Sequence, residues 1–162
     1  MRHGAAEPYA QTDLARALTA RGRADASAAG RYLADEGLVP DHAFVSAAER
    51  TRQTWDEVRA ASKSSAEADF DQSLYGAHAD GILEMVRLAP EDAGTVLVIG
   101  HNPAAAYLAS TLDGGDGDAD ALRRLIGGGF PPAALAAFEL EAPWSALDEG
   151  AARLTHVHVG RG

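Results

Sequence analysis

Apolar and polar positions fall along the chain in blocks that predict strands and helices in turn. The clearest strand covers residues 95–100, TVLVIG, because a continuous apolar run rich in β-branched residues is typical of a buried parallel strand. A shorter apolar run at 43–45 predicts a second strand, and 133–140 and 153–159 predict two more. Strands that alternate with helices indicate an α/β layered sheet.

Boundary residues support the helices between these strands. Helical segments are predicted at residues 20–36, 49–61 and 104–112, with part of a fourth at 82–88. The first begins after Thr19 and stops before Gly37, which suits a left-handed position at a helix end. Asn102 is expected to cap the third of these, with Pro103 as its first residue. We therefore expect one domain over residues 1–162, a three-layer α/β/α fold with a mostly parallel sheet and residues 95–100 as a central strand.

Composition narrows the possible partners. The formal net charge of −10 repels nucleic acid and anionic membranes, and no apolar run approaches the ~20 residues that span a bilayer, so neither partner is expected. The absence of cysteine excludes disulfides and thiolate metal sites and fits a cytoplasmic location. An anionic substrate would need a local cluster of arginines to overcome the overall charge.

Two other groups of polar residues do not favour a metal site. Residues 113–120, DGGDGDAD, lack the spacing of an EF-hand loop and predict a solvated turn. His156 and His158 share one face of a predicted strand, but no carboxylate pattern accompanies them, so a solvent-facing pair is expected. No metal and no cofactor is predicted.

The candidate chemistry lies at the carboxyl ends of the strands, where open α/β sheets bind their ligands. Arg50 follows one predicted strand and His101 follows another, and Arg2 and His3 would supply a third end if a strand preceded them. The planar guanidinium of arginine suits phosphate oxygens, and an imidazole can attack phosphorus. Two arginines and two histidines around one point indicate phosphoryl transfer without a metal.

Five stretches in order along the chain carry a resemblance to a known family. They are Arg2-His3-Gly4, DLARALTARG at 13–22, SAAERTRQT at 46–54, SLYG at 73–76 and VLVIGHNP at 96–103. The sequence resembles the histidine phosphatase superfamily, which has the phosphoglycerate mutase-like fold, and is most similar to its SixA-type phosphohistidine phosphatases.

The resemblance implies a role for each matching residue. His3 corresponds to the nucleophile that becomes phosphohistidine, and Arg2 and Arg50 correspond to the phosphate-binding arginines. His101 corresponds to the second histidine, which would bind the phosphoryl group and stabilise its transition state. Arg16 is also expected to reach the site. Asn102, next to His101, is added to the expected substrate-binding residues.

The sequence departs from the family pattern in three ways. Family members have an apolar strand before Arg-His-Gly where this sequence has only Met1, which suggests that the natural chain begins upstream. Ala47 stands where the family usually has proline. The glutamate that serves as general acid in many ester-cleaving relatives has no clear counterpart, although Asp80, Glu84 and His78 are titratable residues in that region.

Three functions are compatible with this pattern. The first is a phosphatase that removes phosphate from phosphohistidine on a partner protein. The second is a phosphatase of small phosphate esters with the same nucleophile. The third is a phosphate-binding module without catalytic activity. Tyr75 is equally compatible with a pocket wall and with the core, whereas Trp55 and Trp144 are expected to be packing residues.

Overall fold

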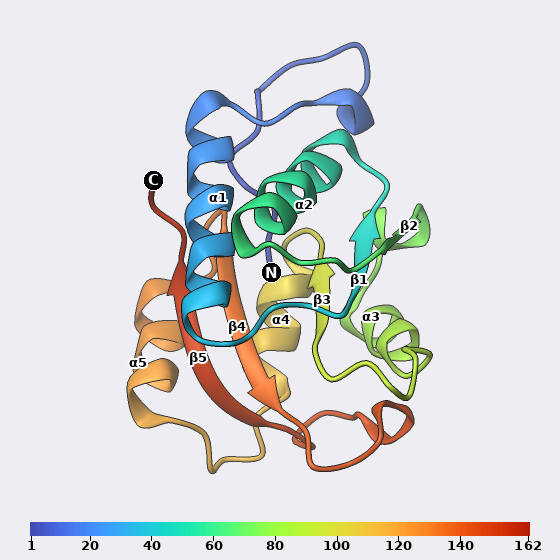
Figure 1. The fold of residues 1–162 in the computed structure, drawn as a ribbon, viewed down its shortest axis with the longest axis vertical. Coiled ribbons are helices and arrows are strands. Elements are labelled where there is room, and N and C mark those ends of the chain that lie inside the picture. The colour runs from blue at the N-terminus through green and yellow to red at the C-terminus, as the bar shows by residue number, and fades with distance from the viewer.

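Five strands form the middle layer of the molecule (Figure 1). The computed structural model describes residues 1–162. Three strands are parallel in the order β2-β1-β3, and two form an antiparallel pair, β4-β5. Their bounds are β1 His42–Ser46, β2 Ala68–Asp71, β3 Val96–Ile99, β4 Ala134–Glu139 and β5 Arg153–Val159.

The first three residues join the two sheets. The Met1 amine donates to the Val98 carbonyl (2.8 Å), and the Gly100 N–H donates to the Met1 carbonyl (3.1 Å). On the other side, the Arg2 N–H donates to the Ala134 carbonyl of β4 (2.9 Å). The segment therefore lies between β3 and β4, and β3 holds the central position that the sequence predicted.

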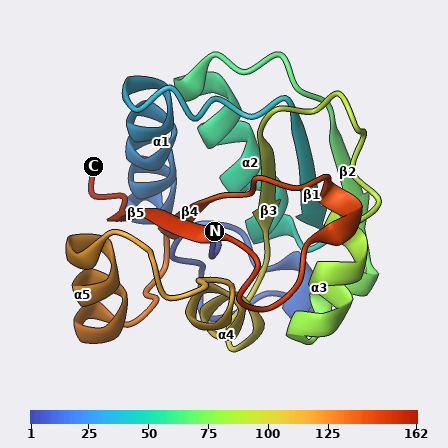
Figure 2. The same ribbon diagram turned by 90° about the horizontal axis from the view of Figure 1, so that it is seen from below.

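Helices cover both faces of this layer (Figure 2). Helices α1 and α2 lie on one side, and α3, α4 and α5 lie on the other. The helices are α1 Ala20–Asp35, α2 Glu49–Ser62, α3 Ala79–Val86, α4 Ala104–Thr111 and α5 Ala119–Gly128, with short 3₁₀ turns η1 Asp13–Ala15, η2 Ser73–Tyr75 and η3 Trp144–Ala146. The three-layer α/β/α prediction is confirmed. None of these helices has both the length and the apolar character needed to cross a membrane.

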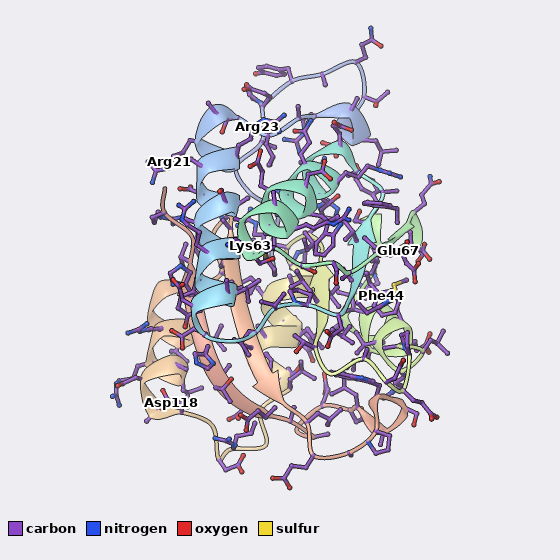
Figure 3. All side chains as sticks on the ribbon, viewed as in Figure 1. Arg21, Arg23, Phe44, Lys63, Glu67 and Asp118 are labelled. Atoms are coloured by element: carbon purple, nitrogen blue, oxygen red, sulfur yellow. The ribbon has the colours of Figure 1, made fainter.

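The apolar core fills the space on both sides of the strands. Trp55 and Val58 of α2 pack with Val45 and Ile99 on one face. On the opposite face, Phe44 belongs to a cluster with residues of α3 (Figure 3). Trp55 is buried as expected, which confirms its packing role.

Several boundaries agree with the sequence, and one cap does not. The Thr19 hydroxyl accepts from the Gly22 N–H (2.9 Å) at the start of α1, and Gly37 adopts a positive φ of 70° after its end. The expected Asn102 cap is wrong: α4 begins at Ala104 with Pro103 in the cap position. The side-chain amide of Asn102 instead donates to the Phe130 carbonyl (2.9 Å).

Residues 113–120 and the pair His156 and His158, which the sequence analysis considered as metal sites, have other roles. Asp118 caps α5, a helix that the sequence reading missed (Figure 3), and Asp113 accepts from the Leu154 N–H. His158 stacks on Tyr32 with ring centroids 3.9 Å apart, and both histidines of the pair are half-buried. The expectation of a solvent-facing pair is therefore wrong, because α1 covers this part of β5. No group of three or more potential metal ligands occurs.

A large apolar cavity of about 820 Å³ lies between β3 and β4. Met1, Val98, Leu135 and Phe138 contribute to its wall. Neither of the two candidate catalytic histidines lines it, so this cavity is separate from the candidate chemistry.

Candidate active site

Three segments that are distant in sequence meet at one end of the parallel strands. Residues 1–3 bring in Arg2 and His3, the first turn of α2 after β1 brings in Arg50, and the end of β3 brings in His101. The rings of His3 and His101 lie 5.1 Å apart between centroids. The structure thus brings together the four residues that the sequence singled out for catalysis.

Gly4 allows His3 to reach this position. The Gly4 N–H donates to the buried Thr54 hydroxyl (3.0 Å), and that hydroxyl donates to the Arg50 carbonyl (2.6 Å). A Cβ on Gly4 would lie 2.6 Å from the Gly22 carbonyl oxygen at the start of α1. The absence of a side chain at Gly4 therefore lets the N-terminal segment pass close to α1.

Replacing Gly4 with alanine should destabilise the protein by about 1–3 kcal/mol, the usual cost of overpacking, because backbone atoms would have to move. Urea unfolding measures the change. Gly81→Ala is the matched control, since the nearest atom to its Cβ lies at 3.9 Å and alanine favours the α3 helix. Equal stability for Gly4→Ala and the wild type would contradict this account of the glycine.

His3 is held as a neutral imidazole with a defined tautomer. Burial lowers the pKa of His3 to about 4, with further lowering by the charges of Arg50 and Arg2. Its Nδ1 lies 2.7 Å from the Gly4 carbonyl oxygen. A carbonyl only accepts hydrogen bonds, so Nδ1 carries the proton and Nε2 keeps its lone pair.

His101 is also neutral, and its neighbours assign the opposite tautomer. Burial lowers the pKa of His101 to about 4, and His3 and Arg50 lower it further. The Arg50 Nη2 lies 3.4 Å from Nδ1, and the Ser46 hydroxyl lies 2.8 Å from Nε2. Since a guanidinium only donates, Nδ1 accepts and Nε2–H donates to Ser46.

These values predict the acid limb of the pH profile. A histidine with its lone pair is required for attack on phosphorus, so kcat/KM for an aryl phosphate should stay level from neutral pH to about pH 5 and fall as the pH approaches the His3 pKa of about 4. Repeating the measurement with a series of aryl phosphates separates the ionisation of the substrate from that of His3. A limb centred near 6.5, the ordinary histidine value, would contradict this assignment.

The same pKa values affect stability. The imidazoles of the unfolded chain take up protons near pH 6.5, whereas the folded ones resist protonation until about pH 4, so stability should decline as the pH falls through this window.

Two arginines are anchored yet retain an unused donor. Arg50 is buried and donates through Nη1 to the Asp13 carbonyl (2.8 Å). Arg2 donates through Nη1 to the Phe130 carbonyl (3.0 Å), the oxygen that also binds Asn102. The Nε–H groups of both arginines are buried without a protein acceptor. Each guanidinium therefore has one N–H donor without a partner in the protein.

Arg16 reaches the site through a carboxylate that the sequence reading did not identify. Its Nε donates to Asp13 Oδ1 (2.8 Å), and Arg50 Nη2 donates to Asp13 Oδ2 (3.1 Å). The Tyr75 hydroxyl also donates to Oδ2, and its ring stands edge-on to His101. Tyr75 therefore contributes to the site rather than to the core. The three-residue spacing between Asp13 and Arg16 was the one available signal for this contact.

Ser46 and Thr54 also belong to the site without having been selected from the sequence. Both are buried hydroxyls that bind site residues. The titratable residues considered as general acids, Asp80, Glu84 and His78, are exposed, on α3 or at its start, and none makes a hydrogen bond to the histidines or arginines of the site.

Comparisons with known proteins agree with this geometry. The family model of the histidine phosphatase superfamily (branch 1) matches residues 1–75, which include His3 and Arg50. An uncharacterised protein of Mycobacterium tuberculosis (strain H37Rv) is 32% identical over 162 residues, with 99% of this chain and 100% of that protein covered.

Solved structures extend the likeness over the full length. A candidate SixA phosphohistidine phosphatase from Nakamurella multipartitia has a TM-score of 0.79 and 30% identity, with 99% of this chain and 93% of that chain covered. A candidate SixA from Agrobacterium tumefaciens has a TM-score of 0.77 and 25% identity over 98% and 94% of the chains. A SixA solved with tungstate has a TM-score of 0.78 at 24% identity over 98% and 94% of the chains, which shows the shared fold. These likenesses confirm the predicted resemblance, and the chain belongs to branch 1 of the histidine phosphatase superfamily.

Proposed function

We propose that this protein is a metal-independent phosphatase that removes phosphate from phosphohistidine on a partner protein. The observation that carries the proposal is the cluster of two neutral histidines, with ring centroids 5.1 Å apart, beside two arginines whose buried Nε–H groups have no protein acceptor. This arrangement supplies a nucleophile and unused donors for a phosphoryl group.

In the first half of the reaction, the Nε2 lone pair of His3 attacks phosphorus. A phosphorus–nitrogen bond forms at Nε2, and the bond from phosphorus to the substrate imidazole breaks, with its electron pair going to the departing nitrogen. The other ring nitrogen of the substrate carries a proton, so the leaving group is a neutral imidazole. The Gly4 carbonyl keeps Nδ1–H in place and stabilises positive charge on the His3 ring. Arg2 and Arg50 bind the phosphoryl oxygens as charge moves onto them.

In the second half, water attacks the phosphorus of the phosphorylated His3. The phosphorus–nitrogen bond breaks, inorganic phosphate is released, and the electron pair returns to Nε2. His101 lies across the site from His3 and would contact the phosphoryl group in both steps. The Nε2–H of His101, which donates to Ser46 in the structure, would donate to the phosphoryl oxygens when substrate is bound.

The leaving group decides between the two substrate classes. The Asp13 carboxylate contacts the site arginines, and hydrogen bonds from Tyr75 and Arg16 lower its pKa to about 2. It is ionised at neutral pH and has no proton to give. A phosphohistidine ring that is protonated at its other nitrogen departs as neutral imidazole without a general acid, whereas an alkoxide requires one, which favours phosphohistidine over alkyl esters.

Incubation with p-nitrophenyl phosphate and with a phosphorylated histidine-containing phosphotransfer protein tests the proposal. Release of phosphate from the phosphoprotein, unaffected by a chelator, is the expected result. Turnover of small esters without activity on the phosphoprotein would favour the second function predicted from the sequence. Binding of tungstate with no turnover of either substrate would favour the non-catalytic module.

A further inference from the structure

Asp13 is the point at which the charged side chains of the site converge. Its carboxylate accepts from Arg16 Nε (2.8 Å), from Arg50 Nη2 (3.1 Å) and from the Tyr75 hydroxyl. Its backbone carbonyl accepts from Arg50 Nη1 (2.8 Å). These donors come from the residue that follows η1, from α2 and from η2, so Asp13 connects its own turn with two other segments.

Asp13 sets the orientation of Arg50. Both terminal nitrogens of this guanidinium donate to Asp13, and the other contact of Nη2 is the long one to His101 at 3.4 Å. Two donors fixed on one residue hold a planar guanidinium in a single orientation. That orientation determines how Arg50 faces His101.

Asp13 also sets the charge of the site. Arg2, Arg16 and Arg50 are cationic, both histidines are neutral, and the Asp13 carboxylate is ionised. The resulting balance is two positive charges, which matches a phosphoryl dianion. A neutral side chain at position 13 would leave three positive charges and a guanidinium pair without its anionic partner.

We propose that Asp13 is a positioning residue, whose carboxylate orients Arg50 and Arg16 for the phosphoryl group and limits the affinity of the site for free phosphate. The inference rests on the proposed phosphatase function and extends it. A site that binds phosphate too tightly retains its product, so the carboxylate favours turnover at the expense of ground-state binding.

The test compares Asp13→Asn with the wild type and with Glu7→Gln. The asparagine keeps the shape of the side chain and removes its charge. Glu7 is the matched control, because it is an exposed carboxylate on the same segment whose side chain makes no hydrogen bond or ion pair. Three quantities are measured: kcat with p-nitrophenyl phosphate, the inhibition constant of inorganic phosphate, and the rise in melting temperature caused by phosphate.

Asp13→Asn should lower kcat by ~10-fold or more, as expected for loss of a charge-assisted hydrogen bond. It should also bind phosphate more tightly, with a lower inhibition constant and a larger rise in melting temperature. Glu7→Gln should match the wild type. If Asp13 only stabilised the loop, its replacement would not lower kcat and at the same time raise the affinity for phosphate.

An Asp13→Asn protein with wild-type kcat and wild-type phosphate affinity would overturn the inference, as would weaker phosphate binding. A wild type that hydrolyses no substrate would instead refute the proposed function. In that case, the phosphate-dependent melting temperatures of the two proteins still decide the role of Asp13, because they require no turnover.

Discussion

Replacing His3 with alanine should lower the rate of phosphate release by roughly 10⁴- to 10⁶-fold, the range seen when the nucleophile of a covalent mechanism is removed. The expected loss is large because no other side chain of the site offers a comparable lone pair: the Nδ1 lone pair of His101 is directed at Arg50, and its Nε2 carries the proton given to Ser46. Steady-state assays with p-nitrophenyl phosphate and with the phosphoprotein measure the loss.

Two controls separate chemistry from folding in this experiment. His156→Gln removes a half-buried histidine of β5 outside the site and should retain wild-type activity. His3→Ala should still be stabilised by inorganic phosphate, since Arg2, Arg16 and Arg50 remain. Substantial turnover by a folded His3→Ala protein would exclude His3 as the nucleophile.

Substrate preference should depend on the leaving group by a factor of ~10² to 10⁴, the usual contribution of a general acid. Alkyl phosphates and phosphoserine should be the poorest substrates, because their alkoxides need a proton on departure. Aryl phosphates should be intermediate, and phosphohistidine should be cleaved most readily. The measurement is kcat/KM for one substrate of each class at a single pH.

The contacts of Asp13 are consistent with this ranking. The carboxylate in contact with the site arginines is Asp13, with a pKa of about 2, whereas Asp80 and Glu84 are exposed on α3. Equal cleavage of the alkyl and aryl esters would show that a proton donor reaches the leaving group. The small-ester phosphatase would then become the preferred function.

The central strand and the main helices were predictable because their signals are local. Residues 95–100 form a β-branched apolar run, and Thr19 and Gly37 mark the ends of α1 by capping and by a positive φ. The grouping of Arg2, His3, Arg50 and His101 was also predictable, because each follows a strand end or belongs to a stretch that resembles the family.

Other features depended on contacts that local sequence patterns do not specify. Asp13 binds Arg50 across 37 positions, and the Asn102 amide is taken by a carbonyl 28 positions away instead of capping α4. Helix α5 was missed because glycines crowd its end and an acidic, glycine-rich stretch precedes it. The covering of His158 by Tyr32 likewise depends on how α1 packs on β5.

The most direct test of the proposed mechanism is to identify the phosphorylated residue in an acid-labile intermediate. Wild-type protein is mixed with excess p-nitrophenyl phosphate, quenched in base within the first turnover, digested and mapped by mass spectrometry. The account predicts one phosphoryl group on His3, attached at Nε2, because Nδ1 donates its proton to the Gly4 carbonyl. Phosphate on another residue or at Nδ1 of His3, or turnover by a protein that is never phosphorylated, would contradict it.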